Sequence, residues 1–310
     1  MGKLYLGTQE ITPFIFDEGV GVPRKINNSN ALIIPDTNFT YSVPDSVSTI
    51  GSYALTYAFY YSTGLKSIST SNVTDLGAYA MEYACTHCTN LETVLFPELV
   101  SITGSNALSN TFNGCTAITS VSFPKLTTIG ASGSNYAFGN TFSGCTSLAS
   151  VSFPELTTVS GSNNLYTFKG TALTTVNFPK LETSGALYGW FQNCTSLTSV
   201  SFPKLTEAKG QCFQVAFSGC SSLTTVDLSK LKTVNSSSTF QNAFNNCTSL
   251  TTLSFPELTA PGANGAWQNM LYGCSNVTVH FPSALQSTMS SWANVTGGFG
   301  GTNTTVLFDL

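Results

Sequence analysis

The sequence has very few charged residues. They make up 8% of its 310 residues, against roughly a quarter in ordinary soluble proteins. The polar surface must therefore consist mainly of Ser, Thr, Asn and Gly. The formal net charge is −4, the isoelectric point is near 5.1, and Lys and Arg do not cluster. This composition argues against nucleic acid and against anionic membranes as partners.

Several other features are missing. No apolar run reaches the roughly 18 residues of a membrane helix, so we expect no membrane insertion. The first ten residues do not resemble a signal peptide, so either export follows another route or the numbering begins after a removed segment. With two histidines and no phosphate-loop, nucleophile-elbow or zinc-protease motif, we expect no enzyme, no catalytic or metal site and no cofactor.

A repeat organises the sequence. The stretch from Phe142 to Val159, F-S-G-C-T-S-L-A-S-V-S-F-P-E-L-T-T-V, returns in similar form along most of the chain. Its F-P-x-L block begins at Phe96, Phe123, Phe153, Phe178, Phe202, Phe255 and Phe281, with Leu228 in the one missing slot. Successive starts are 27, 30, 25, 24, 26, 27 and 26 residues apart. Such a period indicates a solenoid, in which each unit covers its neighbour's open apolar face.

Most of the cysteines share one position of this repeat. Those three residues before the repeat's Leu, Ile or Val are Cys88, Cys115, Cys145, Cys194, Cys220, Cys247 and Cys274. A cysteine fixed to the repeat phase is most simply a small buried apolar residue, stacked from coil to coil. Because stacked side chains point the same way, the disulfide torsion would be hard to reach, and we expect free thiols.

The cysteine slots also define the organisation of the chain. Counted from Ser62 to Cys274, and including a shortened copy at Phe168 to Leu173, they give nine units. We expect residues 43–282 to form the solenoid. Residues 1–42 would be an N-terminal cap or attachment segment and residues 283–310 a C-terminal cap, because a solenoid must cover its exposed end units.

Two periods alternate within a unit. Val151 and Phe153 alternate with Ser152, which predicts a short strand with Ser152 outward and Pro154 ending the regular pairing. Apolar residues four apart, such as Phe138 and Phe142, predict a short helix. Glycines follow these pairs at Gly144, Gly219 and Gly273, where a helix C-cap favours glycine.

The unit from Phe142 to Val159 resembles the BspA-like, or Treponema-type, leucine-rich repeat, F-x-x-C-x-x-L-x-x-I-x-[IL]-P-x-x-[VL]-x-x-I-G, over residues 43 to 282. The units here are a few residues longer and have Phe at the strand's second apolar position. The resemblance implies an α/β solenoid, namely a right-handed leucine-rich-repeat superhelix. Its parallel β-sheet would be concave, with short helices or turns on the convex side.

Two patterns could carry chemistry, and each has a simpler interpretation. The variable residue of F-P-x-L forms a column of charged residues, namely Glu98, Lys125, Glu155, Lys180, Lys204, Lys230 and Glu257. Paired carboxylates two coils apart could suggest a glycosidase, but the intervening lysine favours a surface ion-pair ladder. Cys85 and Cys88 form a C-x-x-C, yet a zinc site needs two more ligands, and Cys85 stands in the slot of Phe142.

The candidate ligand-binding residues fall into two groups. The first is a column of outward strand residues, Ser122, Ser152, Asn177, Ser201, Asp227, Ser254 and His280. A parallel column runs through Ser120, Ser150, Thr175, Ser199, Thr225, Thr252 and Thr278. They predict either a plain soluble sheet face or a hydroxyl-rich surface for glycans or polypeptide. The second group is Tyr57, Tyr60 and Tyr61, which suit recognition or pack under the N-terminal segment.

Three functions remain open. The resemblance implies bacterial surface or secreted proteins that bind host proteins, other cells or glycans, and a non-enzymatic recognition or adhesion protein is favoured. A phage or prophage virion component is the alternative, because Lys3 to Ile11, K-L-Y-L-G-T-Q-E-I, is similar to openings of phage structural proteins. A β-helical polysaccharide-degrading enzyme would need coils built only of strands.

Overall fold

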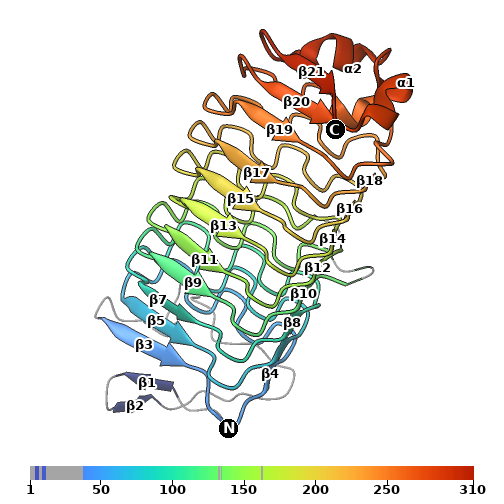
Figure 1. The fold of residues 1–310 in the computed structure, drawn as a ribbon. Coiled ribbons are helices and arrows are strands. Elements are labelled where there is room, and N and C mark those ends of the chain that lie inside the picture. Colours follow the sequence, from blue (N-terminus) through green and yellow to red (C-terminus); the bar gives the residue numbers. More distant parts are fainter. Residues whose placement is uncertain (1–3, 7–8, 12–37, 132, 134, 162) are drawn as a thin grey trace.

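The computed structural model describes residues 4–6, 9–11, 38–131, 133, 135–161 and 163–310. Stacked coils with parallel strands and little helix form a solenoid (Figure 1). Each regular coil places one strand in a first wall, a shorter strand in a second wall and a series of turns in a third. The predicted parallel solenoid is therefore confirmed, while its right-handed superhelix and concave curvature stay predictions.

The first wall, here called the strand face, is formed by one strand from each coil. Parallel pairing joins β3-β5-β7, β9-β11, β13-β15-β17 and β19-β20-β21, and these groups follow one another along the stack (Figure 1). The strands are β3 (Phe39–Ser42), β5 (Leu65–Ser69), β7 (Thr93–Leu95), β9 (Ser120–Ser122), β11 (Ser150–Ser152), β13 (Thr175–Asn177), β15 (Ser199–Ser201), β17 (Thr225–Asp227), β19 (Thr252–Ser254), β20 (Thr278–Phe281) and β21 (Thr305–Phe308).

The second wall consists of two-residue strands that each follow a corner, and that corner contains proline in all of them except those before β6 and β18. Its pairing runs β4-β6 and then β8-β10-β12-β14-β16-β18. The strands are β4 (Thr49–Ile50), β6 (Asp75–Leu76), β8 (Ser101–Ile102), β10 (Thr128–Ile129), β12 (Thr158–Val159), β14 (Thr183–Ser184), β16 (Glu207–Ala208) and β18 (Thr233–Val234). Proline breaks the ladder between the two walls because it has no N–H to donate.

The third wall, the turn wall, comprises residues 52–61, 78–87, 105–114, 136–144 and matching stretches of later coils. The helices predicted here from the four-residue spacing are wrong, since overlapping four-residue turns form instead. Ser109 N–H donates to Asn106 O at 3.1 Å, whereas the next N–H, of Asn110, donates to Gly139 O of the following coil at 2.9 Å. An α-helix would direct every N–H to the carbonyl four residues earlier in its own segment.

A positive φ angle at every fourth residue explains the four-residue spacing that suggested a helix. φ is positive at Asn106 (56°), Asn110 (54°) and Gly114 (70°). Asn and Gly tolerate this region best, and a type II turn requires it at its third residue. The apolar residues between them, Leu108 and Phe112, both point into the core and are fully buried. The glycines expected to be helix C-caps are the last positive-φ residues of each series.

Stacked aromatic rings fill the core. Phe123 and Phe153, from the F-P-x-L block, lie 5.3 Å apart with an interplanar angle of 2°. In a second column, Phe142 stacks on Phe112 at 5.3 Å and on Phe168 at 5.7 Å. Equivalent residues thus repeat at nearly the coil spacing, so each ring contacts its counterparts above and below. This confirms the inward orientation predicted for the repeat's phenylalanines.

The cysteines form a third buried column, and all nine are free thiols, as predicted. Each thiol at the shared slot lies against a backbone carbonyl of the preceding coil. Cys145 Sγ–H donates to Phe112 O at 3.1 Å, and Cys115 Sγ–H donates to Cys85 O at 3.0 Å. Serine could make the same bond, but cysteine does so without an additional strongly polar group in the core. The shared slot is therefore explained by packing and hydrogen bonding.

The two ends differ from the regular coils. Near the start, β1 (Leu4–Leu6) and β2 (Gln9–Ile11) pair antiparallel. The sequence Phe14-Ile15-Phe16 also predicts a short strand, which lies outside the described residues. The last coils contain the 3₁₀ helices η1 (Asn264–Trp267), η2 (Ser283–Leu285) and η3 (Gly298–Gly300) and the helices α1 (Gln286–Met289) and α2 (Ala293–Thr296). The proposed cap boundaries stay predictions.

Candidate functional site

The strand face brings the first group of candidate residues into one column. Parallel register pairs Ser122 with Ser152, then Asn177 with Ser201 and Asp227. The last pair is Ser254 with His280, at the C-terminal end of the stack. Each strand has its middle residue buried and its flanking residues exposed or half-buried. Sequence alternation thus predicted correctly which side chains point outward.

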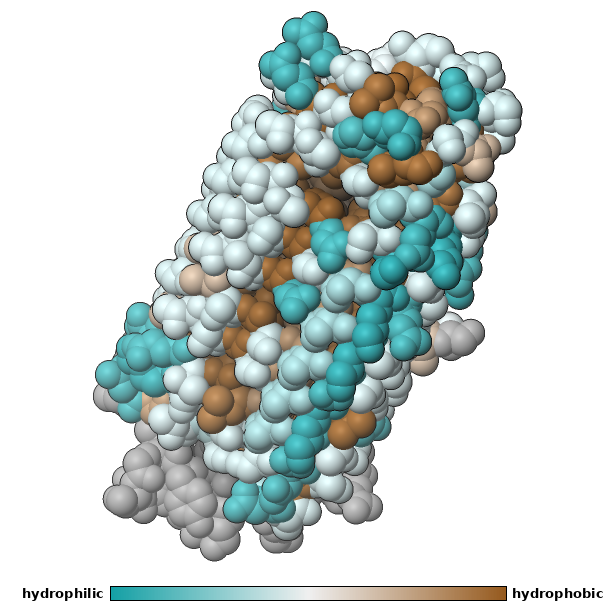
Figure 2. Space-filling model, in the orientation of Figure 1, coloured by the Kyte–Doolittle hydropathy of each residue, from teal (hydrophilic) through white to brown (hydrophobic). Residues whose placement is uncertain are grey.

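An apolar floor underlies these polar columns. The middle residues of the strands are buried, but Val151 and Val226 keep 9% and 8% of their surface exposed because their neighbours are short. Figure 2 shows an apolar stripe along the strand face, bordered by paler residues and, on one side, by a hydrophilic band. The surface offers hydroxyl groups, peptide edges and shallow apolar contact along several consecutive coils.

Within the column from Ser122 to His280, charged or ionisable side chains occur only toward the C-terminal end. Asp227 accepts hydrogen bonds from Ser201 Oγ at 3.1 Å and from Ser229 N at 3.0 Å. Burial alone would raise the pKa of Asp227, but the bonds from Ser229 and Ser201 outweigh it and lower the pKa. Two coils further on, His280 Nδ1 lies 2.9 Å from Asp309 Oδ1. Both ionisable groups are thus held by neighbours.

The hydrophilic band beside the strand face corresponds to the charged residues at the variable position of the F-P-x-L block. Lys125 Nζ lies 2.6 Å from Glu98 Oε2, and Lys180 Nζ lies 2.6 Å from Glu155 Oε2. The predicted ladder therefore forms, but as separate pairs between adjacent coils. Since each carboxylate that suggested a glycosidase is engaged by a lysine, the pairs support the structural interpretation.

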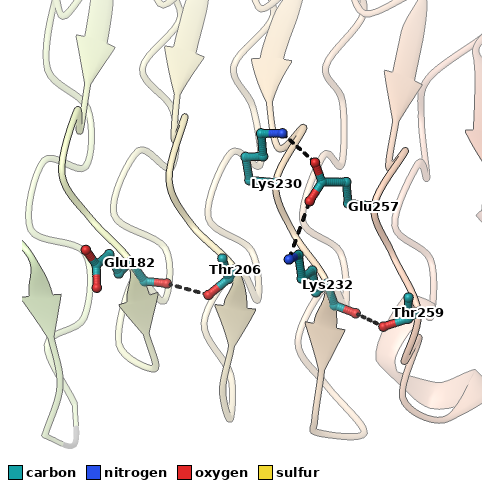
Figure 3. Close-up of polar contacts among 6 residues, drawn as sticks. All are labelled: Glu182, Thr206, Lys230, Lys232, Glu257 and Thr259. Carbon is teal, nitrogen blue, oxygen red and sulfur yellow. Dashed lines mark hydrogen bonds and ion pairs between the residues drawn. The ribbon is translucent and has the colours of Figure 1, made fainter.

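One part of the band joins three charged groups. Glu257 faces both Lys230 and Lys232, with Lys232 Nζ 3.7 Å from Glu257 Oε2 (Figure 3). The hydrogen bond from Lys230, followed by the charge of Lys232, lowers the pKa of Glu257. Nearby threonine hydroxyls donate to backbone carbonyls of the preceding coil, as Thr206 does to Glu182 O at 3.3 Å. These contacts tie neighbouring coils together at the surface.

The second group of candidates lies elsewhere. Tyr57, Tyr60 and Tyr61 belong to the turn wall, between β4 and β5, and are separated from the polar columns of the strand face by the intervening corner. Their exposed fractions are 46%, 39% and 53%. The fold therefore does not unite the two groups into one site.

The C-x-x-C motif is part of the core. Both sulfurs are fully buried, and Cys88 Sγ–H donates to Phe59 O at 2.9 Å. Burial, followed by the contacts with Cys88 and Cys115, raises the pKa of the Cys85 thiol. Within the described ranges no group of three or more His, Cys, Asp or Glu side chains could hold a metal ion. Nor does that part of the chain contain a helix able to cross a membrane.

The column predicted from the sequence leaves out the residues that continue it at both ends. In register, Ser69 pairs with Leu95, and His280 pairs with Leu307, so both ends of the column carry an exposed leucine. The signal for Leu95 was present, because T-V-L-F-P at residues 93–97 aligns with S-V-S-F-P at residues 120–124. The partner of His280, Asp309, had no repeat pattern that could reveal it.

Comparison with models of protein families identifies the family of this chain. The BspA type leucine-rich repeat region matches in six copies, over residues 36–141, 110–241 and 188–293. Because these matches cover most of the sequence, the chain belongs to the BspA type leucine-rich repeat family. A search among curated proteins finds no match.

Solved structures of leucine-rich-repeat and surface proteins are distantly similar. The pneumococcal vaccine antigen PcpA is 13% identical over 87% of this chain and 76% of its own, with a TM-score of 0.38. A leucine-rich cell surface protein from Faecalibacterium prausnitzii is 17% identical over 87% and 88%, with a TM-score of 0.34. An internalin, InlF, from Listeria monocytogenes is 13% identical over 85% and 83%, with a TM-score of 0.26. Scores this low add no argument about function.

Family membership bears on the competing functions. A repeat family of stacked coils argues against an enzyme, and the coils are not built only of strands, as the polysaccharide-degrading alternative required. The phage or prophage alternative gains no support from these comparisons.

Proposed function

We propose that this protein is a non-enzymatic recognition or adhesion protein, secreted or displayed on a cell surface. It binds a protein or a glycan through the strand face. The observation that carries the proposal is the register of β9 to β20, which aligns short polar side chains into two continuous columns. Its membership of the BspA type repeat family is consistent with this role.

The chemistry of the columns fits an extended partner. Serine and threonine hydroxyls both donate and accept hydrogen bonds, so they can engage sugar hydroxyls or peptide groups without a fixed charge pattern. Each contact is weak, and the affinity grows with the number of consecutive coils that the ligand spans. The shallow apolar floor under Ser152 and its neighbours adds contact area without a deep pocket.

Three lysines on the strand face test the proposal. Ser122→Lys, Ser152→Lys and Asn177→Lys, combined in one protein, place three charges on consecutive coils at exposed positions. The control carries Ser147→Lys, Ser196→Lys and Ser249→Lys, three exposed residues in the connections that precede the strands. Both variants change the net charge equally, so a purely electrostatic effect would appear in both.

Binding is measured on immobilised extracellular-matrix proteins and on a glycan array. We expect the strand-face variant to lose at least tenfold in affinity for at least one matrix protein or glycan that the native protein binds, while the control keeps it. Thermal unfolding of both variants should stay within a few degrees of the native protein, because no core residue changes. Equal binding by both folded variants would refute the strand face as the site.

A further inference from the structure

The first two described coils carry tyrosine at most positive-φ positions of the turn wall, where later coils mostly carry Asn or Gly and depart from this at Tyr136, Tyr166 and Val215. φ is 62° at Tyr53, 57° at Tyr57 and 59° at Tyr61. In the third described coil the corresponding residues are Asn106, Asn110 and Gly114. A bulky side chain in this region costs about 1–2 kcal/mol per residue relative to glycine. Folding alone therefore favours Asn or Gly here, and the tyrosines need another explanation.

The tyrosine rings form an ordered array. Tyr53 stacks on Tyr79 with ring centroids 4.7 Å apart and an interplanar angle of 5°. Tyr57 stacks on Tyr83 at 4.9 Å and 6°. Tyr60 lies edge-on to its neighbours, 5.5 Å from Tyr57 and 4.6 Å from Tyr61. Because each ring is held by another, the array is organised before any ligand binds, which lowers the entropy cost of binding.

The array remains open to solvent although it is aromatic. Tyr53 is 56% exposed and Tyr61 is 53% exposed. Tyrosine combines a large apolar ring with a hydroxyl group that donates and accepts, so exposed clusters of tyrosine suit recognition. Glu82 is half-buried beside Tyr83 and Tyr57, and burial raises its pKa. A carboxyl group is thus available at the edge of the rings.

We propose that this tyrosine array is a second binding surface and that it takes an uncharged glycan. The array consists of Tyr53, Tyr57, Tyr60, Tyr61, Tyr79 and Tyr83. A hexopyranose ring has one face of polarised C–H bonds, which packs on the electron-rich face of an aromatic ring. Its rim of hydroxyls matches the phenol hydroxyls and the carboxyl group of Glu82.

Charge favours an uncharged sugar over an acidic one. Between residues 51 and 88 the only lysine or arginine is Lys66, and the only histidine is His87, whose ring lies 4.7 Å from that of Tyr61. Lys66 belongs to β5 on the strand face and pairs with Glu92 at 3.0 Å. A sulfated or carboxylated glycan would therefore find no lysine or arginine in the array and would meet the carboxyl group of Glu82.

The repeat itself supplies the substitutions for a test. Tyr53→Asn, Tyr57→Asn and Tyr61→Gly together give the first described coil the residues of the third, which tolerate positive φ. This variant should fold at least as stably as the native protein. The matched control is Tyr272→Asn, which removes a tyrosine that is 58% exposed near the other end of the solenoid.

Affinity electrophoresis through gels containing laminarin, dextran, mannan or heparin measures binding. We expect retardation of the native protein and the Tyr272 control by at least one neutral polysaccharide and not by heparin, with retardation lost in the triple variant. The strand-face lysine variant should be retarded like the native protein, which separates this site from the proposed function. The inference is overturned if no neutral polysaccharide retards the native protein or if the triple variant is retarded equally. A native dimer that becomes a monomer in the triple variant would also overturn it, by assigning the array to contact between copies.

Discussion

From Asn193 to Gly273, asparagine and glycine alternate between neighbouring coils at the last positive-φ position of the turn wall, and the reason is steric. Gly219 has φ of 79°, and a Cβ atom added there would lie 2.3 Å from Asn193 Oδ1 of the preceding coil. Gly170, with φ of 69°, occupies the same position in the shortened coil, and a Cβ there would meet nothing within 4 Å. The substitution Gly219→Ala therefore combines backbone strain with a clash, whereas Gly170→Ala involves strain alone.

The two costs can be separated by a third variant. Gly170→Ala should destabilise by about 1–2 kcal/mol, the cost of a Cβ at positive φ. Gly219→Ala should cost about 1–3 kcal/mol more, as overpacking does. Asn193→Gly removes the clashing side chain, so Gly219→Ala in that background should cost no more than Gly170→Ala. The coupling between residues 193 and 219 is then on the order of 1–3 kcal/mol.

Urea unfolding followed by tryptophan fluorescence measures these differences. Trp190 is fully buried in the same coil as Asn193 and packs on Phe168 at 5.7 Å, so it reports on this part of the stack. Two outcomes would contradict this reasoning. They are equal shifts of the urea midpoint in Gly170→Ala and Gly219→Ala, or a Gly219→Ala shift that Asn193→Gly does not reduce. Either outcome would mean that the Asn193 side chain does not fill the space beside Gly219.

Two further predictions concern the core. Phe142→Ala removes a fully buried ring stacked on two others and should cost about 3–5 kcal/mol, whereas the exposed Ser152→Ala should change stability by less than about 0.5 kcal/mol; urea unfolding giving equal values would contradict the assigned orientation. Burial raises the pKa of the Cys145 and Cys212 thiols from 9.0 to about 12. Stability should be complete below pH 9 and fall as pH rises toward 12, because only the unfolded chain ionises, by about 1.4 kcal/mol per pH unit and thiol. The urea midpoint followed with pH should fall less steeply in Cys145→Ala, and an unchanged slope would refute the effect.

The sequence predicted the walls made of strands better than the wall made of turns. Alternation around Val151 has only one interpretation as a half-buried strand, and the structure agrees. A spacing of four, as in Leu108 and Phe112, is compatible with both a helix and a four-residue turn. The residues that distinguish them are Asn106 and Asn110, whose preference for positive φ indicates turns. That signal is present in the sequence at both positions.

For the candidate site, the sequence predicted which side chains point outward but not which residues they contact. Repeat phase was enough to place Ser122 and Ser152 in one column. It could not reveal that His280 meets Asp309, because Asp309 follows the last repeat. Nor could it show that Tyr57 stacks on Tyr83, since that contact depends on a backbone conformation that tyrosine rarely adopts.

Each coil exchanges hydrogen bonds with the coils before and after it, through nearly the same backbone positions. A recombination event that removes or duplicates one whole unit therefore joins two surfaces that still match. The distance between the two ends would change by only about 4.8 Å, one strand spacing, and no new kind of contact would be needed. The number of coils can thus vary between generations more easily than most single core residues, and with it the reach of the molecule and the length of its binding faces.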